Sequence, residues 1–152
     1  MMTNAVELGP RARWAPPPEQ IALYVRANGI VEPLFTEPAL ARVLGYRGVV
    51  VPGPMLTAFL EQFVRRELAG WRLEALSTTF RIPTIAGDRM VFSGVVTEQH
   101  YLLEGERIVC DLVIDHADSE RAVTGTATLR RLPGQRYAPE MANRRDAGLE
   151  RP

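Results

Sequence analysis

The sequence has very few of the residues from which metal centres and disulfides are built. It contains one cysteine, Cys110, and two histidines, His100 and His116, among 152 residues. A single cysteine excludes an internal disulfide and a zinc site made of several cysteines, and two histidines exclude a multi-histidine metal centre. We therefore expect no metal and no cofactor, and the cysteine content favours a cytoplasmic location.

An excess of basic charge is also missing. Eighteen Lys and Arg residues balance eighteen Asp and Glu residues, whereas a nucleic-acid-binding surface needs a clear positive excess. No apolar run approaches the ~20 residues of a membrane span, and the N-terminus lacks the apolar stretch of a signal peptide. Nucleic acid and membranes are therefore not expected as partners. The P-loop, dinucleotide-binding and nucleophile-elbow motifs are absent too.

The length of the chain predicts one domain. It has 152 residues and a mass of 16.9 kDa, which is the size of a single domain. Residues 1–16 show no apolar periodicity and are predicted to form an extended N-terminal lead-in. Residues 17–132 carry the periodic segments of the domain. Residues 133–152, rich in Arg, Pro, Ala and Glu, are predicted to be a disordered or draped tail.

Apolar residues at helical spacing predict three helices. The first follows Pro16-Pro17-Pro18 and ends near Gly29, and Thr36 is expected to cap a second that stops at Gly45. The strongest signal follows Pro52-Gly53-Pro54, where apolar residues cover a broad face over about 15 residues of helix. So broad a face predicts a central helix enclosed by other structure. Its apolar residues are Met55, Leu56, Phe59, Leu60, Phe63, Val64 and Leu68.

After Trp71 the apolar period changes to two. This predicts three or four long strands joined by short turns, and hence antiparallel neighbours. A buried helix followed by such strands is an α+β design in which an antiparallel sheet curls around the helix. The hot-dog fold and the cone-shaped fold of ketosteroid-isomerase-like proteins both fit. Pro52-Gly53 favours the hot-dog fold, because there a helix N-terminus is exposed at a site. The clearest strand alternates Ile108, Cys110, Leu112 and Ile114 with Val109, Asp111, Val113 and Asp115.

The stretch from Glu19 to Val64 resembles the MaoC-like hydratase and dehydratase family of hot-dog proteins. The family pattern runs from a short helix through D-x-N-P-x-H and A-x-x-x-A to a P-G or H-G before the central helix. The corresponding string here is Ile30-Val31-Glu32-Pro33-Leu34-Phe35-Thr36-Glu37-Pro38-Ala39-Leu40-Ala41. Gly45, Gly48 and Pro52-Gly53 follow at family-like intervals.

The resemblance continues into the strands and covers about residues 19–131. Phe80-Arg81-Ile82-Pro83 with Ala86-Gly87-Asp88 is similar to the family's F-x-x-P-x-x-x-G-D turn, and Phe92-Ser93-Gly94-Val95-Val96 to the strand after it. The resemblance implies a hot-dog fold and an acyl thioester ligand, linked to CoA or to a carrier protein.

The family's proton-transferring pair is replaced in this chain. In the family, the aspartate and histidine of D-x-N-P-x-H act on a water and on the carbon next to the thioester. The aspartate position is Ile30 and the histidine position is Phe35. Neither side chain holds or moves a proton, so the family's acid–base catalysis by this loop alone is excluded. Ile30 and Phe35 are instead expected to contact substrate.

The other half of the family site is an amide at the start of the central helix, which donates to the acyl carbonyl. Gly53 is expected to supply it, because free N–H groups at a helix N-terminus favour developing negative charge. Pro54 has no amide of its own to offer. Val51, Pro52 and Pro54 are expected to line the substrate site. The alternative is that Pro-Gly-Pro merely turns the chain into the helix.

Glu32 stands where the family has asparagine and is the candidate for a displaced acid or base, if its apolar neighbours raise its pKa. The alternative is a solvated loop carboxylate or a backbone cap. Glu37 is interpreted as a first-turn helix acid and Asp88 as a turn residue. Glu61 is too deep in the helix to position water for a thioesterase.

The remaining candidates have mainly structural interpretations. His100 and His116 are expected at surfaces or turns, and Cys110 as a small buried hydrophobe. Arg65 and Arg66 complement the helix dipole, or meet a phosphate of CoA or a carrier protein.

Four functions remain open from the sequence. The first is an active lyase of the hydratase or dehydratase type. The second is a non-catalytic subunit of a heteromeric hydratase. The third and fourth are a thioesterase and a repurposed biosynthetic enzyme that uses the same apolar pocket. We expect a homodimer in addition, because one hot-dog sheet leaves an edge strand and an apolar flank unpaired.

Overall fold

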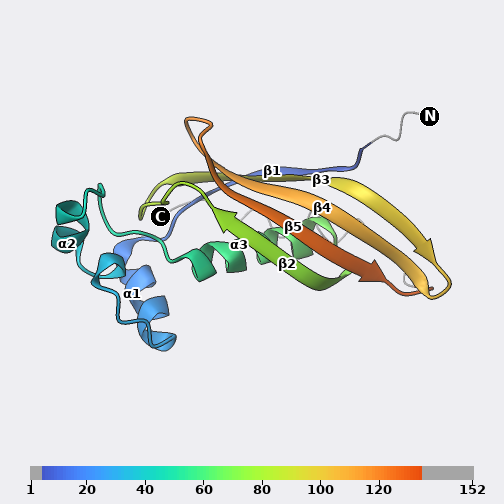
Figure 1. Cartoon of the computed structure of the whole chain (residues 1–152), viewed down its shortest axis with the longest axis horizontal. Helices are drawn as coiled ribbons and strands as arrows, with labels where there is room; N and C mark the ends of the chain where they lie inside the picture. Colours follow the sequence, from blue (N-terminus) through green and yellow to red (C-terminus); the bar gives the residue numbers. More distant parts are fainter. Residues whose placement is uncertain (1–4, 135–152) are drawn as a thin grey trace.

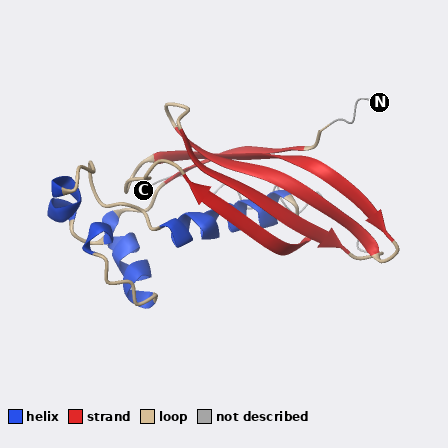
Figure 2. Ribbon diagram, viewed as in Figure 1, coloured by secondary structure: helices blue, strands red, loops and turns tan. Residues whose placement is uncertain are grey.

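The computed structural model describes residues 5–134. Figure 1 shows a curled sheet arching over α3 (Gly53–Glu67), which lies along the concave side, while α1 (Pro18–Ala27) and α2 (Pro38–Val43) gather at one end. Figure 2 shows the same separation of strands from helices. The remaining elements are β1 (Glu7–Trp14), η1 (Pro33–Phe35), β2 (Arg72–Phe80), β3 (Arg89–Leu102), β4 (Gly105–His116) and β5 (Arg121–Arg131).

The sheet is antiparallel throughout, in the order β1-β3-β4-β5-β2. Strands β3, β4 and β5 are neighbours joined by short turns, as predicted. The prediction of neighbours in chain order is wrong for β2, which pairs with β5 and not with β3. The reason is that residues 81–88 do not form a hairpin turn, because part of this segment pairs with the residues that precede α3.

Strand β1 differs from the extended lead-in expected over residues 1–16. It pairs with β3 along the edge of the sheet, with a register shift between Leu8 and Arg11. Leu8 is its only buried side chain, so the segment has no apolar alternation to reveal it. Residues 7–14 therefore belong to the sheet, although they precede the segment from residue 17 in which the domain was expected. The expected tail over 133–152 lies almost entirely outside the described residues.

The core forms between the concave side of the sheet and α3. The alternating apolar residues predicted in β4 are all buried, and so are Phe92 of β3 and Val123 of β5. Burial of such side chains contributes roughly 1.5–3 kcal/mol each. The buried residues of α3 are Met55, Leu56, Leu60, Phe63 and Val64, which confirms the central enclosed helix.

The short helices differ from prediction only at their ends. Thr36 closes η1, and Glu37 occupies the N-cap position of α2 without a side-chain hydrogen bond. Thr36 therefore does not cap α2. No helix within residues 5–134 has the length and apolar content required to cross a bilayer.

Candidate functional site

The residues that lead into α3 are held by backbone hydrogen bonds to the loop between β2 and β3. The Val51 amide donates to the Thr84 carbonyl at 2.8 Å, and the Ala86 amide donates to the Val49 carbonyl at 2.9 Å. Val51 and Pro52 are buried. The direction in which the chain enters the helix is therefore fixed by two packed segments rather than by one flexible turn.

Gly53 is the first residue of α3 and has an unused amide. The amides of Met55 and Leu56 donate to the Pro52 carbonyl at 3.0 and 3.2 Å, and Pro54 has no N–H. No hydrogen-bond acceptor for the Gly53 N–H lies among residues 5–134. Gly53 is only partly buried. A free donor at a helix N-terminus is the arrangement that stabilises a developing oxyanion.

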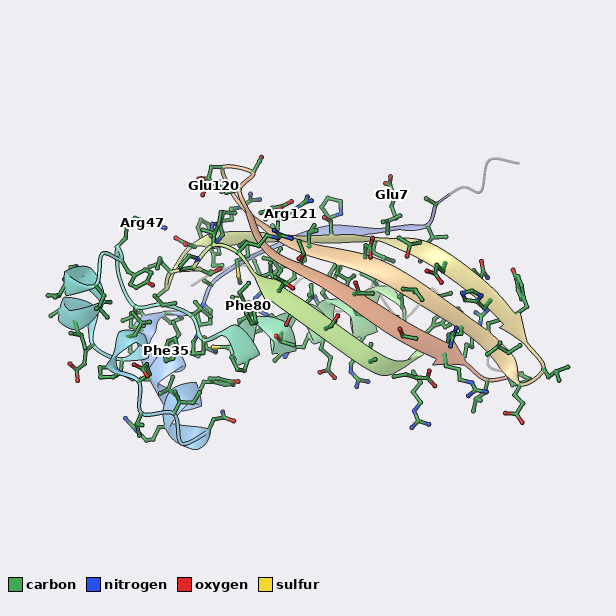
Figure 3. The ribbon with its side chains drawn as sticks, viewed as in Figure 1. Glu7, Phe35, Arg47, Phe80, Glu120 and Arg121 are labelled. Atoms are coloured by element: carbon green, nitrogen blue, oxygen red, sulfur yellow. The ribbon has the colours of Figure 1, made fainter. Side chains whose placement is uncertain are left out.

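The ring of Phe80, at the end of β2, packs directly against Gly53. A Cβ added to Gly53 would come within 2.8 Å of this ring, so no side chain larger than hydrogen fits without movement. Phe80 is 49% exposed, and Figure 3 shows it beside the first turn of α3. It therefore forms a movable apolar wall next to the amide.

Two threonines tie the same part of α3 to β2. The Thr57 hydroxyl lies 3.2 Å from the Gly53 carbonyl, to which it donates, and 2.9 Å from the Thr78 hydroxyl. This contact positions the first turn of the helix against the edge strand.

Ile30 and Phe35, which the sequence places at the expected positions of the family's proton-transferring pair, are partly buried and pack against the hydrophobic core. Their loop reaches the segment before α3, because the Val50 amide donates to the Leu34 carbonyl at 3.4 Å. The structure thus brings this loop and the α3 entrance together. Figure 3 labels Phe35 on the loop.

Glu32 lies exposed at the N-terminal end of η1, and its side chain does not cap that turn. Ile30 and Phe35 pack inward and do not cover it. Within one chain Glu32 is thus a solvated loop carboxylate. Glu37 is exposed as well, and Glu61 pairs with Arg65 at 2.8 Å on the surface of α3.

Asp88 acts as the turn residue that the sequence indicated. Its carboxylate accepts the Ile85 amide at 2.9 Å and two bonds from Arg47, both at 3.1 Å. Asp88 therefore stabilises the loop that also contains Thr84, whose carbonyl accepts the Val51 amide.

His116 has a contact that the sequence did not reveal. Its Nε2 lies 3.1 Å from the hydroxyl of Thr84, and Thr84 is fully buried. The two residues are 32 positions apart, so no local pattern could have found the pair. His100 pairs with exposed Glu98 at 2.9 Å. Cys110 is fully buried, as expected, and its burial raises the pKa of the thiol to about 11.

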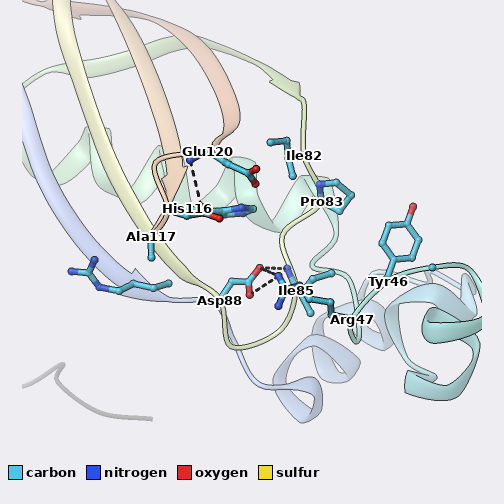
Figure 4. Close-up of a pocket in the computed structure, with 12 residues that line it drawn as sticks. Tyr46, Arg47, Ile82, Pro83, Ile85, Asp88, His116, Ala117 and Glu120 are labelled. Carbon is cyan, nitrogen blue, oxygen red and sulfur yellow. Dashed lines mark hydrogen bonds and ion pairs between the residues drawn. The ribbon is translucent and has the colours of Figure 1, made fainter.

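A cavity of about 560 Å³ lies beyond the loop that carries Asp88. Figure 4 shows Asp88 held by Ile85 and Arg47 on one side, with His116 and Glu120 on the other. His116, Asp118 and Glu120 place ligand atoms within 4.8 Å of one another, so this group of described residues could hold a metal ion by distance. The carboxylates are exposed at a hairpin turn, where acidic groups commonly occur without an ion, and the distances alone assign no metal.

No family model matches the chain, and no curated protein matches it. Solved structures do match its fold. The ChsH1-ChsH2 complex from Mycobacterium tuberculosis is 19% identical, with a TM-score of 0.71 over 86% of this chain and 99% of that chain. The (R)-hydratase from A. caviae is 21% identical, with a TM-score of 0.71 over 85% and 96%.

A MaoC-like dehydratase from Rhodospirillum rubrum gives a TM-score of 0.74 at 14% identity, over 88% of this chain and 94% of that chain. At these identities the likeness shows the fold. The chain therefore has the hot-dog fold of MaoC-like dehydratases and R-hydratases, which confirms the fold predicted from the sequence.

Proposed function

We propose that the protein binds an acyl thioester, linked to CoA or to a carrier protein, with the acyl oxygen hydrogen-bonded to the Gly53 amide. The observation that carries the proposal is the unused Gly53 N–H at the start of α3, beside the apolar ring of Phe80. Solved structures of the same fold include a hydratase and a dehydratase, and the resemblance of the sequence to the MaoC-like family implies the same ligand class.

The proposal assigns little hydration activity to the isolated chain. Ile30 and Phe35 cannot transfer a proton, and each general acid–base group typically contributes about 10²–10⁴-fold to a rate. Glu32 remains the candidate for a displaced acid or base. Because it is exposed in one chain, a partner surface would have to cover it before it could act in a dry site.

The second candidate is a non-catalytic subunit of a heteromeric hydratase. The packing of Ile30 and Phe35 against the core favours it, because these apolar side chains contribute packing and cannot transfer a proton. One structure of the same fold is a two-component complex, ChsH1-ChsH2. In such an assembly the partner would supply the proton-transferring groups.

The edges of the sheet indicate how subunits would associate. Strand β1 carries Pro10, a register shift and two arginines, which are features that block strand addition at an edge. Strand β2 has no proline and a run of Ser, Thr and Phe. We therefore propose that a homodimer, or the hetero-oligomer of the second candidate, forms by pairing through β2.

A cytoplasmic location is also part of the proposal. The single cysteine, Cys110, is free and buried, and a fold that needs no disulfide is compatible with the reducing cytoplasm.

The direct test measures binding and hydration of crotonyl-CoA by the purified chain. We expect saturable binding together with turnover far below that of a competent hydratase. Brisk turnover would contradict the missing acid–base pair, and Glu32→Gln would then show whether Glu32 has replaced it. Absence of binding would contradict the proposal itself.

The homodimer is tested by light scattering at micromolar concentration. The measured molar mass is expected to be about twice the 16.9 kDa of one chain.

A further inference from the structure

A second feature of α3 lies toward its other end, where the helix meets β1. Arg11 and Arg13 of β1 both reach α3: the Arg11 Nε lies 2.7 Å from Glu67, and the Arg13 guanidinium lies 4.0 Å above the ring of Phe59. Residues two apart on a strand point to the same face. Both arginines therefore point from the edge strand toward the helix.

These arginines line a small surface cleft together with Arg66. The cleft has a volume of about 60 Å³, which corresponds to about two water molecules and suits one compact anionic group. Its remaining lining residues are Ala12, Phe59, Gln62, Phe63 and Phe92. None of the acidic side chains among residues 5–134 lines it, although the chain as a whole has no net charge.

Arg13 differs from Arg11 in having no acidic partner among residues 5–134. The Glu67 carboxylate pairs with Arg11 and also accepts a hydrogen bond from the Gly9 amide at 3.1 Å. Both of its oxygens therefore already have a partner. The Arg13 side chain makes no hydrogen bond or ion pair with any of residues 5–134. Stacking on Phe59 covers one face of the guanidinium and leaves its in-plane N–H donors available.

Arg66 brings a second positive charge close to Arg13. Partial burial and then the charge of Arg66 lower the pKa of Arg13. A planar guanidinium matches a phosphate with two parallel hydrogen bonds, and a second cation in the same cleft adds to the attraction for an anion.

We propose that this cleft binds a phosphate group, with the Arg13 fork as its main donor and Arg66 as the second cation. The inference rests on the proposed function only for the source of the phosphate, since CoA and the carrier-protein arm both contain phosphate esters. Phe59 and Arg66 lie roughly 9 and 20 Å beyond Gly53 along α3, at 1.5 Å per residue. A flexible pantetheine arm spans distances of this order between a phosphate and a thioester.

The alternative is that the inward arginines only protect the β1 edge from adding another strand, which is a common use of inward-pointing charge. The two interpretations predict different affinities of Arg13 variants for phosphate esters. If the arginines only protect the edge, variants of Arg13 will associate with one another more readily, but their affinity for phosphate esters will be unchanged.

The test uses the full chain and three probes that lack an acyl group: CoA, dephospho-CoA and 4′-phosphopantetheine. By calorimetric titration we expect Arg13→Gln and Arg66→Gln each to weaken CoA binding about tenfold. Arg13→Lys is expected to recover only part of the loss, because it keeps the charge and loses the fork. Arg65→Gln is the matched control, since Arg65 is the next residue and pairs with Glu61 outside the cleft; it should stay within about twofold of the unchanged protein.

The three probes identify the phosphate. A loss confined to CoA assigns the 3′-phosphate, a loss shared with dephospho-CoA assigns the diphosphate, and a loss that extends to 4′-phosphopantetheine assigns the phosphate also present on carrier proteins. The proposal is overturned if the unchanged protein binds none of the probes, or if Arg13→Gln and Arg65→Gln have equal effects on all three. Because no probe carries an acyl group, this result is independent of the Gly53 amide.

Discussion

Phe80 covers Gly53 so closely that a Cβ on residue 53 would lie 2.8 Å from the aromatic ring. The contact joins the free edge of the sheet to the first turn of α3. It also explains why the helix starts with a glycine although its φ angle does not require one. The amide and its apolar wall therefore form one unit.

Gly53→Ala is expected to lower the free energy of unfolding by about 1 kcal/mol, at the low end of overpacking costs, because the half-exposed ring can move outward. The same substitution in a Phe80→Ala background should cost nothing further, since the obstructing ring is gone. Thermal unfolding of the four proteins in this double-mutant cycle measures the coupling. Equal costs in both backgrounds would show that the two residues do not interact.

Gly94 is a second glycine required by close packing. A Cβ there would lie 2.7 Å from the Leu112 side chain and 2.8 Å from the Asp111 carbonyl oxygen, which is backbone and cannot rotate away. Gly94→Ala is expected to destabilise the protein by about 1–3 kcal/mol. Gly48→Ala is the control, because its added Cβ would meet only a side-chain methyl at 3.2 Å. Chemical denaturation should rank the two variants in this order.

Cys110 makes stability depend on pH in the alkaline range. Burial, followed by the charge of Asp111, raises its pKa from 9.0 to about 11. Below pH 9 the thiol is protonated in both the folded and unfolded states and has no effect. Between about pH 9 and 11 only the unfolded state loses the proton, so this group lowers stability by up to ~1.4 kcal/mol per pH unit.

Cys110→Ala is expected to flatten that part of the stability profile, measured by denaturation at several pH values. The native thiol should also react slowly with a thiol reagent at pH 8 and rapidly in denaturant. Fast native labelling would contradict its burial.

The sequence was sufficient to predict those strands whose apolar residues follow a local pattern. Ile108, Cys110, Leu112 and Ile114 alternate strictly, because one face of β4 packs on α3, and all four are buried. The strand β1 has a single buried residue, Leu8, and so it has no comparable pattern. The neighbour of β2 depends on a pairing with residues about 50 positions away, which local periodicity does not encode.

The candidate site was predictable to a similar extent. Pro52-Gly53-Pro54 marks a helix start with one spare amide, and this is readable from three residues. Neither the packing of the Phe80 ring on Gly53 nor the hydrogen bond between His116 and Thr84 follows from spacing, because each joins residues that are distant in the chain. Tertiary packing, rather than local preference, decides such contacts.

The central claim, that the Gly53 amide binds the acyl oxygen, is tested most directly by removing that N–H in a background that has room for a side chain at residue 53. Phe80→Ala makes room for a Cβ, and Gly53→Ala or Gly53→Pro is then added. Both double variants carry a Cβ at residue 53, but only the proline lacks the N–H.

The measurement is the affinity of the two double variants for crotonyl-CoA, with free CoA as the reference ligand and circular dichroism as the check on folding. We predict that Phe80→Ala/Gly53→Pro binds crotonyl-CoA about tenfold more weakly than Phe80→Ala/Gly53→Ala, the loss expected for one hydrogen bond, while both bind free CoA equally. Equal affinities of the two variants for crotonyl-CoA would contradict the account.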